Sequence, residues 1–200
     1  IVAVAGATAL FICIVALIAS AFTRINFFCV IHALKDILFL AFSTASSEAA
    51  LPGAMKRLEA LGVPKPIVTF VMPTGYSFNL DGSTLYSSAG ILFIAQLYGI
   101  QMPIEQQLLV MVTLMLSTKG IAGVPGAGII VVAATAAAFN LPTEGVAILL
   151  GVDRILDMIR TICNVCGNCM ATVVVACWEK DLTKADFYKN YRAFLEDRAA

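Results

Sequence analysis

Residues 73–84 read Pro-Thr-Gly-Tyr-Ser-Phe-Asn-Leu-Asp-Gly-Ser-Thr, and they place the carboxylate of Asp81 inside an apolar segment that runs from Ile67 to Ile100. At the centre of a bilayer an ionisable side chain costs about 3 kcal/mol or more, so such a residue usually marks a substrate or ion site. The alternative interpretation of Asp81 is a solvent-lined acid in a soluble core. The composition of the chain decides between the two.

The chain has the composition of an integral membrane protein. Of its 200 residues 60% are hydrophobic and 13% charged, whereas a soluble domain has about 25% charged residues. Ile1 to Phe22 contains no charged residue. It is long enough to cross a bilayer as a helix, and it exceeds the apolar region of a signal peptide. We therefore predict an all-α integral membrane protein, and because the chain begins without Met inside this segment, we expect a fragment of a larger one.

Charge and cysteine content exclude or weaken two other classes. The formal net charge of +0 and the absence of a basic cluster exclude nucleic-acid binding. Cys163, Cys166 and Cys169 have the spacing of some iron–sulfur ligand runs. Cys177 follows only eight positions later without a proline, and free cysteine commonly packs as a small hydrophobe. Packing is the preferred interpretation, and we predict no cofactor.

Two segments share an apolar, polar, apolar pattern with arms shorter than a full span. The first, 36–58, has its polar tip at Ser43 to Glu48, and the second, 103–140, has a glycine-rich tip at Ser117 to Gly128. Irregular backbone at membrane depth is tolerated only where protein or water satisfies its polar groups. The pattern predicts two re-entrant hairpins whose tips line a binding cavity.

The remaining two segments carry the polar groups of that cavity. Residues 65–100 exceed one span, and we expect a helix broken at 79–82, where freed carbonyls join Asn79 and Asp81 as oxygen ligands for a small cation. Residues 145–178 form a helix with one polar stripe, because its members follow at steps of four, three, four and four. The stripe consists of Asp153, Asp157, Arg160, Asn164 and Asn168. Residues 179–200 are expected to form a solvated or surface-lying helix.

Asp157 and Arg160 fit an amino acid that bears a side-chain carboxylate. The guanidinium of Arg160 offers a two-pronged donor for a carboxylate, and Asp157 can pair with an ammonium. The alternative is an intrahelical pair at i, i+3 that neutralises itself. Ser46, Ser47 and the glycine-rich tip can supply hydroxyl and backbone N–H donors for a second carboxylate. Thr161 and Asn164, which follow Arg160 on the same predicted helix, can add hydrogen bonds.

Four motifs, in order along the chain, resemble those of the dicarboxylate/amino acid:cation symporters, the glutamate transporter family. They are Ser46 to Pro52, Asn79 to Ser83, Gly123 to Gly126, and Asp153 to Thr161 with Asn164 to Asn168. The resemblance implies that 1–178 is the C-terminal transport domain. In it, 1–34 is helix 6, 36–58 hairpin 1, 65–100 helix 7, 103–140 hairpin 2, 145–178 helix 8 and 179–200 a tail.

The resemblance also implies the roles of individual residues. Asp157 binds the substrate amino group and Arg160 its side-chain carboxylate. The rest of the substrate shell is Ser46, Ser47, Ser83, Val124, Gly128, Thr161 and Asn164. The cation-binding residues, where Na⁺ could bind, are Gly75, Ser77, Asn79, Asp81, Thr118, Lys119, Ile121, Asn164 and Asn168.

Three departures from the family pattern concern the coupling ion. Leu80 lacks the sulfur of a common methionine, and Ser83 keeps the hydroxyl of the usual threonine. Asn168 stands where some sodium-coupled members have an aspartate, so one cation site loses its charge. The coupling ions are thus expected to be Na⁺, H⁺ or both. Glu48 could carry the proton, and the alternative is a solvated acid at the tip.

The resemblance implies a secondary active symporter for glutamate or aspartate, in a bacterial-type inner or plasma membrane and as a homotrimer in full-length form. A C4-dicarboxylate carrier is the alternative. Asp157 favours the amino acid symporter over this carrier, since a substrate without an ammonium group has no use for an acid there. A membrane enzyme needs a nucleophile and base, and the one histidine, His32, lies outside the polar motifs. A channel is a fourth possibility, but paired hairpin gates suit alternating access better than a channel.

Overall fold

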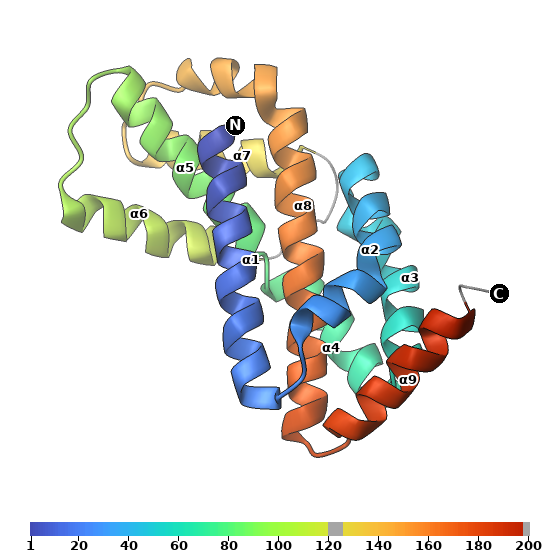
Figure 1. Cartoon of the computed structure of the whole chain (residues 1–200). Coiled ribbons are helices and arrows are strands. Elements are labelled where there is room, and N and C mark those ends of the chain that lie inside the picture. The colour runs from blue at the N-terminus through green and yellow to red at the C-terminus, as the bar shows by residue number, and fades with distance from the viewer. Residues whose placement is uncertain (120–125, 198–200) are drawn as a thin grey trace.

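The computed structural model describes residues 1–119 and 126–197, and within these it consists of helices without strands (Figure 1). The predicted all-α class is confirmed. In chain order the helices are α1 Val2–Thr23, α2 Phe27–Thr44, α3 Ser47–Ala60, α4 Lys65–Phe78, α5 Asp81–Leu97, α6 Ile104–Ser117, α7 Ala127–Ala138, α8 Gly145–Trp178 and α9 Lys184–Asp197. Helices α1, α2 and α8 are long and apolar enough to cross a membrane.

Helix α8 is the central element of the fold. It is 34 residues long, which corresponds to about 51 Å at 1.5 Å per residue, more than the roughly 30 Å hydrocarbon core. It contacts α1, α2, α3, α4, α5 and α7, and Figure 1 shows it running between α1 on one side and α2 and α3 on the other. These contacts with α8 therefore fix where the side chains of the surrounding helices lie.

The structure corrects the expected first boundary, because the segment 1–34 forms two helices. Helix α1 ends at Thr23, where Arg24 adopts the left-handed conformation at φ 60°. Asn26 then caps α2, and its side chain accepts the backbone N–H of Phe28 at 3.0 Å. Asparagine at this position satisfies a donor that the first turn leaves unpaired. The first arm of the α2–α3 pair thus begins at Phe27 rather than at residue 36.

Residues 65–100 are interrupted at Asn79 and Leu80, inside the range 79–82. Helix α4 ends at Phe78 and α5 begins at Asp81, while Leu80 has φ −106° and ψ 61°, outside the helical region. Leu80 has no side-chain acceptor and makes no side-chain cap bond to α5. The first turn of α5 must therefore find its acceptors on another helix.

The helices of the two predicted hairpins, α2 with α3 and α6 with α7, contact each other, as do α1 with α2, α3 with α4, α5 with α6 and α7 with α8. Helices α6 and α7 have 14 and 12 residues, or about 21 and 18 Å, and neither is long enough to span a bilayer. Helix α2, with 18 residues, is longer than the arm that the sequence predicts. The apolar core has two parts. One joins α1, α2, α3, α4 and α9 to the second half of α8, and the other joins α5, α6 and α7 to its first half.

The cysteine run lies in this core. Cys163, Cys166 and Cys169 are free thiols on α8 with at most 1% of their surface exposed. Cys166 and Cys169 pack among the apolar residues of the first core cluster. Their placement supports the packing interpretation.

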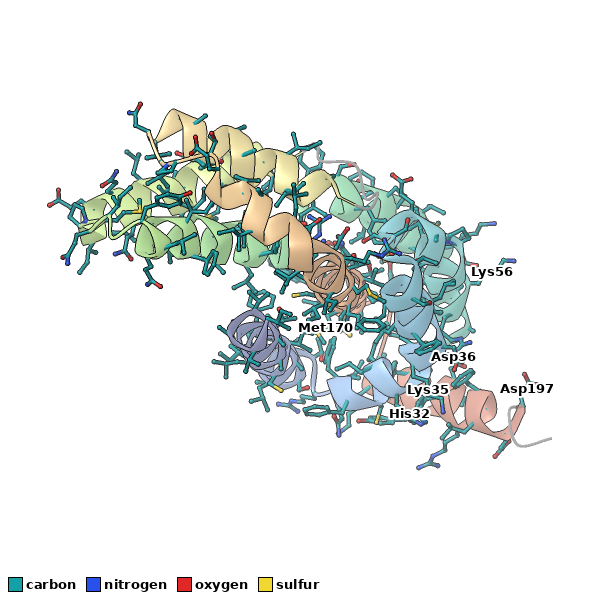
Figure 2. The ribbon with its side chains drawn as sticks, turned by 90° about the horizontal axis from the view of Figure 1, so that it is seen from above. His32, Lys35, Asp36, Lys56, Met170 and Asp197 are labelled. Atoms are coloured by element: carbon teal, nitrogen blue, oxygen red, sulfur yellow. The ribbon has the colours of Figure 1, made fainter. Side chains whose placement is uncertain are left out.

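The tail forms a helix, as expected, but one of its faces belongs to the core. Phe187 of α9 is fully buried. The hydroxyl of Tyr188 accepts the backbone N–H of Asn26 at 3.0 Å, and the hydroxyl of Tyr191 lies 2.9 Å from Nδ1 of His32. Figure 2 shows His32 on α2 beside α9. The tail therefore fixes the junction between α1 and α2.

Replacing Phe187 with alanine tests this role of α9. Removing a fully buried aromatic side chain costs about 3–5 kcal/mol in soluble cores, and we expect a clear drop in the melting temperature of the full-length protein in detergent. Leu195→Ala is the matched control, since Leu195 lies on the same helix and is 37% exposed. Equal melting temperatures for the two variants would show that α9 lies on the surface without supporting the fold.

Candidate functional site

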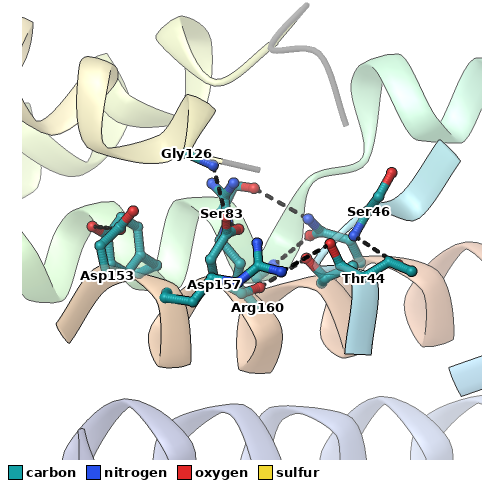
Figure 3. A network of polar contacts seen from close by, with 12 residues as sticks. Thr44, Ser46, Ser83, Gly126, Asp153, Asp157 and Arg160 are labelled. Atoms are coloured by element: carbon teal, nitrogen blue, oxygen red, sulfur yellow. Dashed lines mark hydrogen bonds and ion pairs between the residues drawn. The ribbon is translucent and has the colours of Figure 1, made fainter. Parts of the chain in front are cut away.

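The site is centred on a buried ion pair of α8. Asp157 and Arg160 are 2% and 5% exposed, and Nε of Arg160 lies 2.5 Å from Oδ1 of Asp157. The other carboxylate oxygen accepts the backbone N–H of Gly126, at the start of α7, at 2.7 Å. The intrahelical pair that the sequence offered as an alternative is thus formed, and Asp157 also ties the α6–α7 pair to α8 (Figure 3).

Arg160 has a buried donor that finds no partner in the part of the chain that the structure describes. Its Nη1 atom makes no hydrogen bond to any of the described residues. Gly128 leaves the space that this atom fills, because a side chain there would overlap Nη1. A buried donor left unpaired costs about 1–3 kcal/mol, and more when it is charged. An anionic ligand would remove this cost, and a carboxylate matches the planar guanidinium.

Tyr86 is a site residue that the sequence reasoning missed. Its ring centre lies 5.7 Å from Cζ of Arg160, and its hydroxyl donates to Oδ1 of Asp153 at 2.5 Å. Asp153, the first residue of the polar stripe, is therefore held by Tyr86. Its spacing could have identified Tyr86 as a site residue. It follows Ser83 by three positions on α5, so the two side chains lie on the same face of that helix.

Asn164 caps α5 from outside that helix. Its Oδ1 accepts the backbone N–H of Gly82 at 2.8 Å, and its Nδ2 donates to Oγ of Ser83 at 3.1 Å. Gly82 permits this approach, because a side chain there would overlap the carbonyl oxygen of Arg160 and lie 2.8 Å from Cβ of Cys163. The structure brings Asn164 and Ser83, two residues of the expected substrate shell, together, and here they bind each other. Thr161 donates to the carbonyl of Asp157 at 2.8 Å.

Four of the predicted cation-site residues meet at the break between α4 and α5. Nδ2 of Asn168 donates to the carbonyl of Asn79 at 3.3 Å. With its nitrogen turned to Asp81, the Asn79 amide donates to Oδ1 of that residue at 3.0 Å. Gly75 packs so closely that a side chain would overlap Asn168, and its carbonyl accepts the N–H of Asn79 at 2.7 Å. Carboxylate, amide and carbonyl oxygens are the ligands that hard cations prefer.

The second predicted cation group is only partly described. Ile121 lies outside the described residues, as does Val124 of the substrate shell. Thr118 is fully buried, with Oγ1 3.2 Å from Oγ1 of Thr84. Lys119 reaches α4 with its side chain, and its ammonium donates to the carbonyl of Phe78. Ser77 is exposed on the last turn of α4.

The tip between α2 and α3 lies beside the ion pair. Ser46 caps α3 by accepting the N–H of Ala49 at 3.3 Å, and Ser47 is buried. Arg154 of α8 reaches the carbonyl of Thr44 at 3.5 Å. Figure 3 shows Asp157 and Arg160 between Gly126 of one helix pair and Ser46 of the other. Glu48 is exposed in the first turn of α3, where the helix dipole favours an acid.

The fold and site define a multi-pass integral membrane protein with a buried site suited to an anionic ligand. The sodium:dicarboxylate symporter family matches residues 1–178, and the chain belongs to it. The resemblance found in the sequence motifs is confirmed.

Three relatives illustrate the range of the family. The chain is 52% identical over 175 residues to the proton/sodium-glutamate symport protein of Geobacillus stearothermophilus, covering 88% of this chain and 41% of the relative. It is 54% identical over 162 residues to the proton/glutamate-aspartate symporter of Escherichia coli (strain K12), covering 80% and 37%. It is 43% identical over 178 residues to the C4-dicarboxylate transport protein of Cupriavidus pinatubonensis, covering 88% and 41%. The chain thus spans about two fifths of these relatives.

Replacing Gly82 with alanine tests the close approach of α5 to α8. The added methyl group meets backbone, which cannot rotate away, and overpacking of this kind costs about 1–3 kcal/mol. We expect a lower melting temperature for the full-length protein. Gly151→Ala is the control, because nothing lies within 4 Å of a side chain added at that position. A Gly82→Ala protein as stable as Gly151→Ala would contradict the described packing.

Proposed function

We propose that the full-length protein is a secondary active symporter that moves glutamate or aspartate together with Na⁺, H⁺ or both. The observation that carries the proposal is the Nη1 atom of Arg160, which has no partner among the described residues, in a site where Asp157 supplies the opposite charge. The names of two relatives, a proton/sodium-glutamate symport protein and a proton/glutamate-aspartate symporter, support the same substrate class. No covalent chemistry is part of this function.

The substrate would bind by replacing contacts that the ion pair now makes. Its side-chain carboxylate accepts from Nη1 of Arg160, and its ammonium donates to a carboxylate oxygen of Asp157. That oxygen is now held by Gly126 or by Arg160. The second carboxylate meets Ser47 and the amino-terminal turn of α3, where backbone N–H groups favour an anion.

The contact between Gly126 and Asp157 gives the α6–α7 pair the role of a gate. We propose that α6–α7 and α2–α3 are two re-entrant hairpins that close on the substrate from opposite sides. Opening α6–α7 breaks the 2.7 Å hydrogen bond from the Gly126 N–H to Asp157. The ammonium of the arriving substrate can then donate to the Asp157 carboxylate in its place. Substrate binding and gate movement are then coupled, as alternating access requires. The resemblance adds a homotrimer to this proposal.

The cations would bind near the α4–α5 break. Asp81 provides the single carboxylate of the group, while Asn79, Asn168 and carbonyl oxygens provide neutral ligands. Asp81 could hold Na⁺ with these oxygens or carry a proton itself. The neutral Asn168 lowers the charge available for several sodium ions, so we propose fewer sodium ions than a site with an aspartate would bind.

A C4-dicarboxylate substrate is the second candidate, and the closed ion pair favours it. Asp157 is neutralised by Arg160 at 2.5 Å, so it need not repel a substrate that lacks an ammonium. A relative named as a C4-dicarboxylate transport protein shares 43% identity. Asp157 is then a structural partner of Arg160, and its removal affects all substrates alike.

Replacing Asp157 with asparagine separates the two candidates. We expect aspartate affinity to fall at least about 100-fold, equivalent to about 3 kcal/mol, because the ammonium loses its buried partner. Succinate affinity should change far less. Titration calorimetry on the full-length protein in detergent, with saturating Na⁺ and at low pH, measures both.

Asp181→Asn is the matched control, since Asp181 is exposed between α8 and α9. It should leave both affinities unchanged. If Asp157→Asn weakens succinate and aspartate equally, the amino acid assignment of Asp157 fails.

A further inference from the structure

The side chain of Lys119 crosses from the end of α6 to the end of α4. Helix α6 ends at Ser117 with Thr118 as its cap, so Lys119 belongs to the tip of the α6–α7 pair. Its ammonium donates to the backbone carbonyl of Phe78, the last residue of α4. The two residues are 41 positions apart in the sequence. The contact thus ties the proposed gate, α6–α7, to the helix that carries the predicted cation ligands.

The carbonyl of Phe78 needs a partner because the helix breaks after it. In an unbroken helix this oxygen would accept the N–H of Gly82, four positions later. That N–H instead donates to Asn164. The carboxyl-terminal end of a helix also carries a partial negative charge that favours a cation. Broken helices at membrane depth commonly meet this need with a bound Na⁺ or H⁺.

Among the described residues, those at this position do not fit a free sodium ion. Sodium needs several bare oxygens, yet the Phe78 carbonyl already accepts from the Lys119 ammonium. The Thr118 hydroxyl is paired with Thr84 at 3.2 Å. An ammonium has the charge of one sodium ion and three donors.

We propose that the ammonium of Lys119 is a tethered cation that replaces one exchangeable sodium ion at the carboxyl-terminal end of α4. The inference deepens the proposed function and rests on it, because it concerns the ions that accompany the substrate. When the α6–α7 pair closes, the ammonium of Lys119 moves to the carboxyl-terminal end of α4. When the pair opens, the ammonium moves away from it. A chain built in this way needs one sodium ion fewer for each substrate than a chain with a neutral residue at position 119.

The sodium dependence of aspartate binding tests this inference. The slope of log Kd against log sodium concentration counts the sodium ions bound together with the substrate. For full-length Lys119→Met we expect this slope to be steeper by about one than in the unmodified protein, with weaker binding at low sodium. Lys119→Arg keeps the charge and should keep the original slope. Lys56→Met, at an exposed position of α3, is the control for loss of a positive charge elsewhere.

The possible outcomes separate this inference from the proposed function. If the unmodified protein binds no acidic amino acid, the proposed function fails. If it binds aspartate and Lys119→Met has the original slope, the tethered cation fails. Melting temperatures without substrate provide a second readout. A Lys119→Met protein whose lost stability is restored by sodium supports the inference, and instability that sodium does not relieve contradicts it.

Discussion

The need to pair the polar stripe of α8 inside an apolar bundle determines the arrangement of the other helices. Asp157, Arg160, Asn164 and Asn168 are each at most 5% exposed, and buried polar groups without partners are costly. Two of them find partners on the broken segment, as Asn164 binds the start of α5 and Asn168 binds Asn79. Asp157 binds the start of α7. The chain breaks of a membrane protein are tolerable only where such partners exist.

The proposed function rests on one atom of the same network. Nη1 of Arg160 is buried without a partner among the described residues. A partly satisfied polar network in a low-dielectric interior is poised to accept the group that completes it. Asp157 contacts both Arg160 and the start of α7, so a ligand that binds this carboxylate competes with a contact of the proposed gate. In the proposed function, substrate binding and gate movement are therefore linked through one carboxylate.

Periodicity and composition predicted the parts of this account that depend on local sequence. The apolar spans, the helix over 145–178 with its stripe, and an interruption near Asn79 all follow from residue type and spacing. The polar residues from Thr23 to Asn26 also mark a break in the apolar run, but the left-handed conformation of Arg24 in that break is one that no glycine marks. The buried side of α9, the contact of Tyr86 with Asp153 and the reach of Lys119 to Phe78 depend on tertiary packing. The resemblance placed Lys119 at a cation site, but sequence could not show that its ammonium reaches the carbonyl.

The central claim is that the α8 pair serves a transported acidic amino acid. Uptake of labelled aspartate and of labelled succinate by the full-length protein in liposomes tests it most directly, with an inward sodium gradient and separately with an inward proton gradient. The account predicts aspartate accumulation under at least one gradient, which also identifies the coupling ion. Accumulation of succinate without aspartate under both gradients would contradict it.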